Sequence, residues 1–147
     1  MRVKRRRWGP KDETIDALVA RKATELGTEE DRKLISGSIE ECREAAYRGD
    51  PSVYFKAIIR YEDCSLKAAR NHVLFRLLRD LWPPSHRVQY ATLHLRSESL
   101  VDHFRFFETA HQVLLQRDMT GASAAVRDLT ESEVAFGVRY LPRFNDL

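Results

Sequence analysis

Two ionisable side chains, Glu62 and His111, interrupt apolar stripes of predicted helices. The stripe around Glu62 is completed at helical spacing by Phe55, Ile58, Ile59, Leu66 and Ala69. The stripe around His111 is completed by Leu100, Phe104, Phe107, Leu114 and Leu115. Because an isolated charge is costly in an apolar interior, each group must find a partner, adopt its neutral form, or line a solvated cavity. Two interpretations remain open: each group is satisfied locally or at the surface, or both line one internal pocket.

A second set of polar side chains shares one face of a predicted helix over residues 85–95. This face consists of Arg87, Tyr90 and His94, opposite an apolar face of Val88, Ala91 and Leu95. The guanidinium of Arg87 offers paired donors to a carboxylate, so the face can close a pocket that binds an anion. The alternative is an ordinary solvated surface. We assign no role to the remaining histidines, which are His72, His86 and His103.

Apolar residues recur at intervals of three and four along the chain, and strand patterns are nearly absent, so the elements that position these side chains are expected to be helices. The expected helices cover residues 11–26, 28–49, 50–70, 71–82, 85–95, 97–117 and 120–140, with a break left open at residues 130–133. Short connections place consecutive helices antiparallel to one another. The sequence therefore predicts an all-α fold, an antiparallel bundle of six to seven helices.

Several of these boundaries are marked by residues with capping roles. Thr28 and Asp31 have the spacing of a capping box. Asp50, which precedes a proline, and Asn71 are both suited to begin a helix. Proline lacks an N–H group and disfavours the α conformation in the residue before it, so the tripeptide at residues 82–84 (Trp-Pro-Pro) is expected to end a helix.

The composition is typical of a soluble folded protein, with 147 residues of which 43% are hydrophobic and 32% charged. No apolar run approaches the roughly 18 residues of a spanning helix, and the first residues lack the apolar stretch of a secretory signal. Cys42 and Cys64 have the spacing of neither a metal clip nor a disulfide framework. We therefore expect a cytoplasmic protein with no membrane association.

Positive charge is concentrated in the first ten residues, which contain five basic side chains and no acidic one. Without them the net charge changes from +3 to −2, so the high pI describes this segment and not the folded body. We expect residues 1–10 to form a basic tail or the remnant of a linker. Residues 11–147 are expected to form a single helical domain.

The segment from Gly49 to Trp82, which includes YEDCSLKAARNHVLFRLLRDLW, resembles the FCD domain of FadR-type regulators in the GntR family. The resemblance extends from about Glu13 to Tyr140. It implies an antiparallel helical bundle around a cavity that binds a small organic acid, often through a divalent metal held by an aspartate and three histidines. It also implies that the domain forms homodimers and that the ligand alters DNA binding by an attached winged-helix domain.

Residue by residue, the resemblance places the family's aspartate at Ile58 and its three histidines at Glu62, His111 and Leu129. Isoleucine and leucine offer no lone pair, and two protein ligands rarely hold a metal tightly. We therefore predict no family-type metal and no cofactor, and we expect Glu62 and His111 to hydrogen-bond to each other across the vacated site. In this hypothesis Glu62, His111, Arg87 and Tyr90 are the ligand-binding residues, with Arg87 as counter-charge to the acid.

The predicted function is a ligand-sensing, dimerising regulatory domain without enzymatic activity. Before Glu13 there is no sequence that could form a winged helix, so DNA contact is expected only through a separate domain. The alternative is a protein-protein interaction module that has lost its ligand and uses Phe136, Tyr140 and Phe144. An enzyme is the third choice, because no nucleophile, phosphate-binding loop or metal motif accompanies Glu62 and His111.

Overall fold

The computed structural model describes residues 14–96 and 99–144, with side chains described as far as residue 140. Over these ranges the chain forms six helices and no strand, which confirms the predicted all-α class. The helices are α1 (Ile15–Leu26), α2 (Glu29–Arg48), α3 (Pro51–Ala68), α4 (His72–Leu95), α5 (Leu100–Leu115) and α6 (Met119–Phe144). The predicted basic tail, Ser97 and the Phe144 side chain lie outside what is described.

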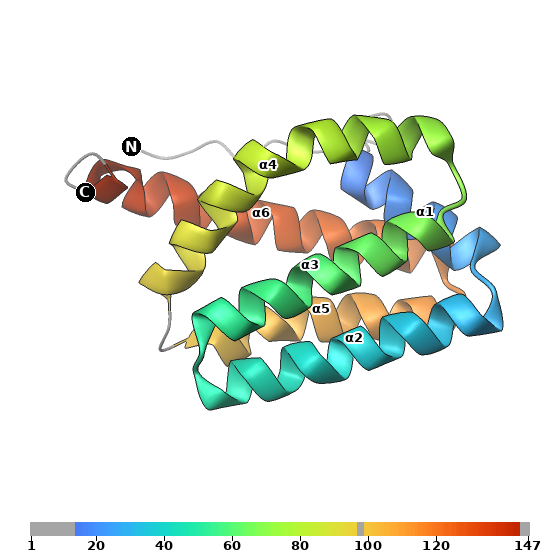
Figure 1. Cartoon of the computed structure of the whole chain (residues 1–147), viewed down its shortest axis with the longest axis horizontal. Helices are drawn as coiled ribbons and strands as arrows, with labels where there is room; N and C mark the ends of the chain where they lie inside the picture. The colour runs from blue at the N-terminus through green and yellow to red at the C-terminus, as the bar shows by residue number, and fades with distance from the viewer. Residues whose placement is uncertain (1–13, 97–98, 145–147) are drawn as a thin grey trace.

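The helices pack so that five of them surround a common interior. α2 packs on α3 and α5, α1 packs on α3 and α6, and α5 packs on α6 (Figure 1). α4 packs mainly on α3, with few contacts elsewhere, and runs along the outer side of the bundle. Because one neighbour supplies most of its contacts, α4 is the helix least restrained by the rest of the fold.

The three predicted capping sites, at Thr28, Asp50 and Asn71, are confirmed. Thr28 and Asp31 form a capping box, with Asp31 N–H donating to Thr28 Oγ1 at 3.2 Å and Thr28 N–H donating to Asp31 Oδ2 at 2.8 Å. Asn71 Oδ1 accepts from two N–H groups of the first turn of α4, at 3.0 and 3.1 Å. Asp50 caps α3 in the same way. Each side chain satisfies N–H groups that have no partner within the helix.

The expected end of a helix at Trp82-Pro83-Pro84 is wrong: α4 continues through both prolines to Leu95, and the predicted separate helix is its second half. Because proline has no N–H group, only the carbonyls of Arg79 and Asp80 lose their helical hydrogen-bond donors. Both residues are exposed, so water can replace these donors. Figure 1 shows α4 changing direction near its middle, as expected for a proline bend. α6 likewise continues without the break left open at residues 130–133.

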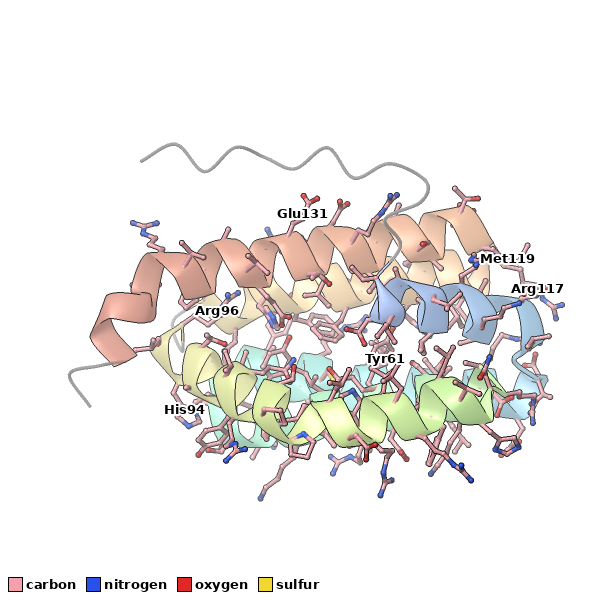
Figure 2. All side chains as sticks on the ribbon, turned by 90° about the horizontal axis from the view of Figure 1, so that it is seen from above. Tyr61, His94, Arg96, Arg117, Met119 and Glu131 are labelled. Carbon is pink, nitrogen blue, oxygen red and sulfur yellow. The ribbon has the colours of Figure 1, made fainter. Side chains whose placement is uncertain are left out.

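The interior contains two groups of buried apolar side chains. One includes Ile58, Leu93 and Phe104, and the other includes Ile35, Leu66 and Leu78. Tyr61 packs against both groups. Figure 2 shows Tyr61 in the interior of the bundle, between α4 on one side and α1 and α6 on the other.

Candidate functional site

A cavity of about 100 Å³ lies between α1, α3, α4, α5 and α6. Its apolar wall is formed by Val19, Ala20, Ala23, Leu78, Trp82, Phe107, Ala110, Leu114, Ala122, Val126 and Leu129. Its polar lining is formed by Asp16, Thr24, Tyr61, Glu62, Ser65, Gln89, Thr130 and Glu133. A largely apolar pocket with a few convergent polar groups is the usual form of a small-molecule site.

Glu62 reaches this cavity from α3 and is paired with a histidine of α4. Its Oε2 lies 2.9 Å from His86 Nε2. The His86 ring is stacked on Trp82, with centroids 5.4 Å apart, and meets the edge of Phe55 at 5.9 Å. These aromatic neighbours fix the imidazole so that one nitrogen faces the carboxylate.

Glu133 reaches the cavity from α6 and ends a chain of hydrogen bonds that runs through the buried His103. Its Oε1 lies 3.2 Å from His103 Nε2, and His103 Nδ1 lies 2.9 Å from the Tyr54 hydroxyl. Burial raises the pKa of Tyr54, so the phenol keeps its proton and can donate to Nδ1, which leaves Nε2–H to donate to Glu133. Gln89 Nε2 lies 3.5 Å from the same carboxylate oxygen.

Asp16, in the first turn of α1, is the third carboxylate of the lining. Its pKa is raised to about 6, first by burial of the carboxyl and then by the negative charges of Glu62 and Glu133, with His86 acting in the opposite sense. The residue also keeps an exposed surface, so its carboxyl is crowded by the cavity wall without being sealed from water. Carboxylates on α3 and α6 therefore act across the cavity on a third carboxylate, on α1.

The predicted pair between Glu62 and His111 is wrong. His111 Nε2 lies 3.2 Å from Ser36 Oγ on α2, and His111 is absent from the cavity lining. Burial lowers the pKa of this histidine, and its Nδ1 has no hydrogen-bond partner. The apolar face of α5 is wide enough to serve two neighbours: Phe107 faces the cavity, whereas His111, on the edge of the same face, faces α2.

Arg87 and Tyr90, predicted as ligand-binding residues, also lie outside the cavity lining. Arg87 is exposed. The Tyr90 hydroxyl lies 3.4 Å from Ser52 Oγ, and its ring packs against Phe55 and against His94, which Figure 2 shows on the outer side of α4. Because α4 is continuous, the face that meets the cavity carries Trp82 and Gln89 instead.

Of the four positions carried over from the family's metal site, Glu62 and Leu129 line the cavity, and Ile58 is buried in the adjoining core. These side chains do not fit the family's ligand set, since Ile58 and Leu129 have no donor atom. Within residues 14–96 and 99–140, no three His, Cys, Asp or Glu side chains are grouped so that they could hold a metal ion. The absence of the family metal stays a prediction.

Sequence reasoning missed Asp16, His86, Gln89, His103 and Glu133 as parts of the site. The sequence contained a signal for two of them, His86 and Gln89. Trp82, His86 and Gln89 share one face only if the helix continues through the prolines, and the predicted stop concealed this spacing. Asp16, His103 and Glu133 become recognisable only when three helices are brought together.

The fold and the site define an all-α bundle with a small internal cavity, and the comparisons identify its family. The FCD domain model matches residues 13–132, so the chain belongs to the FCD family, which provides the effector-binding domains of GntR-type regulators and is not enzymatic. The solved structure of E. coli McbR/YncC matches with a TM-score of 0.77 at 13% identity, over 90% of this chain and 67% of that chain. At this identity the match shows the fold alone.

No curated protein matches the chain. None of the described helices combines the length and the apolarity needed to cross a bilayer.

Proposed function

We propose that this FCD domain binds a small effector in the cavity and passes its occupancy to an attached DNA-binding domain. The observation that carries the proposal is the cavity itself, where carboxylates from three helices meet beside aromatic side chains. Two of its carboxylates, Glu62 and Glu133, are held by His86 and His103 behind the wall, so this part of the site is organised before a ligand arrives.

α4 is the element that can report occupancy. It contributes Trp82 and Gln89 to the lining and the imidazole of His86 to Glu62, yet it is packed mainly on α3. A ligand that competes for Glu62 or Glu133 changes the contacts that hold the second half of α4. A ligand shifts a conformational equilibrium only through such differential contacts.

We also propose that the domain forms homodimers in the cytoplasm. An apolar stripe on the outer side of α4 supports this, because large apolar side chains are exposed there at helical spacing. They are Val73, Leu77, Leu81 and Val88. Because α4 also lines the cavity, a dimer contact through this stripe would connect effector binding to the geometry of the dimer.

The effector class expected from the resemblance, a small carboxylic acid, stays a prediction. The cavity lining described here holds three carboxylates and no Lys, Arg or His. These charges weigh against an acid as the ligand.

The alternative function, an interaction module without a ligand, receives limited support from its predicted surface. Phe136 lies beneath the guanidinium of Arg96, with 3.8 Å between the guanidinium carbon and the ring centroid, and its ring also contacts Tyr140 at 4.4 Å. These aromatic side chains are half-buried and already in contact with the fold.

A thermal-shift screen of small amines, alcohols and acids tests the proposed function. A ligand at about 100 times its Kd stabilises the native state by about 2.7 kcal/mol, which raises the melting temperature by several degrees. Ala110→Leu fills the cavity from α5 and should abolish the ligand-induced rise, whereas Ala124→Leu, outside the lining, should preserve it. If no compound stabilises the wild-type protein, or if Ala110→Leu responds equally, the cavity is not an effector site.

A further inference from the structure

We propose that the cavity takes a small organic cation, a primary ammonium or guanidinium compound, with Asp16, Glu62 and Glu133 as its counter-charges. This inference deepens the proposed function and rests on it. It differs from the organic acid that the family resemblance implies, and it follows from the charges, the unpaired acceptors and the aromatic walls of the cavity.

The charges of the lining are of one sign. Asp16, Glu62 and Glu133 face the cavity from three helices, and no basic residue belongs to the lining as described. His86 and His103 contact Glu62 and Glu133, but neither imidazole belongs to the lining. An incoming carboxylate would meet three like charges, whereas an ammonium group would find three counter-charges.

Two buried polar atoms in the same lining lack hydrogen-bond partners. Ser65 is 9% exposed, and its Oγ has no hydrogen-bond partner. Burial raises the pKa of the Tyr61 phenol, and the nearby Ser65 side chain partly opposes this rise. No group, however, lies at hydrogen-bonding geometry to Ser65 Oγ. The Gln89 Oε1 atom is also buried and unpaired. Buried polar groups are nearly always hydrogen-bonded. The Gln89 Oε1 atom can only accept, so it indicates a missing donor, and Ser65 Oγ can accept from the same group.

An ammonium or guanidinium group supplies such donors. It carries several N–H groups and no acceptor, and can therefore bond to Ser65 Oγ and Gln89 Oε1 as well as to the carboxylates. The neutral acceptors and the charged ones thus select the same kind of ligand. A ligand that carries only acceptors could accept from the Ser65 hydroxyl, but it would leave Gln89 Oε1 and the carboxylates without a donor.

The aromatic walls favour the same class. Tyr61, Trp82 and Phe107 line the cavity, and the rings of Tyr61 and Phe107 meet edge to face with centroids 5.5 Å apart. Cations are attracted to aromatic faces, and most strongly to that of tryptophan. The volume of about 100 Å³ fits a cationic head group with a short aliphatic segment. Since the described carboxylates and histidines are not grouped as metal ligands, an organic cation suits the cavity better than a metal ion.

The test compares three probes of similar size by ligand-observed NMR on the whole chain: n-butylammonium, 1-butanol and butyrate, with methylguanidinium as a second cation. Both cations should bind at least about tenfold more tightly than 1-butanol or butyrate. Glu133→Gln, which removes one counter-charge, should weaken cation binding about tenfold. Glu131→Gln is the matched control, because this carboxylate is exposed and Figure 2 shows it on the outer side of α6.

Asp16→Asn is the second variant, since Asp16 keeps an exposed surface and its replacement is compatible with folding. It should weaken cation binding even if Glu133→Gln fails to fold. Preferential binding of butyrate or 1-butanol that Ala110→Leu blocks would overturn this inference and leave the proposed function standing. Binding of Mn²⁺ or Zn²⁺ alone, lost in Asp16→Asn, would overturn it in favour of a metal. Binding of none of these probes would overturn it too, whereas failure of the wider screen would overturn the proposed function.

Discussion

Two histidines behind the cavity wall hold two of its three carboxylates in place. His86 and His103 each place a nitrogen within 3.2 Å of a lining carboxylate, and each ring is fixed by aromatic neighbours. Among the described residues no imidazole is hydrogen-bonded to Asp16, and burial raises the pKa of this carboxyl. Two carboxylates of the lining thus have an imidazole partner, whereas the third, Asp16, has its pKa raised to about 6.

At the residue scale, His86→Leu should lower the free energy of unfolding by about 1–3 kcal/mol, because it leaves the half-buried Glu62 without its partner. Urea denaturation measures the change. His94→Leu, whose contacts lie at the exposed surface, should change stability by less than about 0.5 kcal/mol. A double-mutant cycle with Glu62→Gln should give a coupling of about 0.5 kcal/mol or more, and a coupling near zero would show that the pair contributes nothing.

Asp16 gives the fold a pH dependence of known sign. Its pKa is about 6 in the native state against 3.8 as the reference, so between these values the native state binds more protons than the unfolded state. The contribution of Asp16 to stability therefore falls as pH rises through this window. Asp16→Asn should stabilise the protein relative to wild type at pH 7, and this gain should shrink toward about pH 4. Urea denaturation across this range measures the difference, and a constant difference would contradict the assignment.

At the element scale, α4 has a capped first turn and an internal bend. Asn71 fixes its first turn, two adjacent prolines bend it, and its second half carries the cavity contacts. The cap could be predicted because Asn71 acts on N–H groups two and three residues away. The continuation of the helix beyond Pro83 and Pro84 could not be predicted. The second half of α4 packs against the bundle, and His86 pairs with Glu62, and these contacts offset the cost of the prolines. Such contacts with other helices are not contained in the local sequence pattern.

Removal of the cap tests the first part of this description. Asn71→Ala should lower the free energy of unfolding by about 1 kcal/mol, since two N–H groups lose their acceptor. His72→Ala, at the exposed next position, should have a smaller effect. Equal effects of the two substitutions in urea denaturation would argue that the cap contributes little.

The exposed apolar stripe on the outer side of α4 is the proposed dimer surface, and charged substitutions test it. Leu77→Glu combined with Leu81→Glu places two charges on the proposed dimer surface and should convert a dimer to a monomer. Light scattering after size exclusion measures the mass. The control is Val134→Glu with Val138→Glu, which charges an exposed apolar surface of α6. A monomeric wild type, or a dimer indifferent to the α4 charges, would contradict this use of the stripe.

At the scale of the whole molecule, the fold is a frame of packed helices with α4 closing one side of an acidic cavity. The helical class and the capping residues could be predicted because they depend on neighbours within a few positions. The pairing of Glu62 could not, because apolar spacing shows that a side chain is turned inward but not which helix it meets. His111 illustrates this limit: it is buried as predicted, but against Ser36 of α2.

The most direct test of the central claim, that effectors bind in this cavity, uses the fluorescence of Trp82. The chain has two tryptophans, and Trp8→Phe leaves Trp82, which lines the cavity, as the sole reporter. Titration with a compound that raises the melting temperature should produce a saturable change in Trp82 emission, with the same Kd as the thermal shift, and Ala110→Leu should abolish it. An unchanged Trp82 emission during binding would place the ligand elsewhere and contradict the claim.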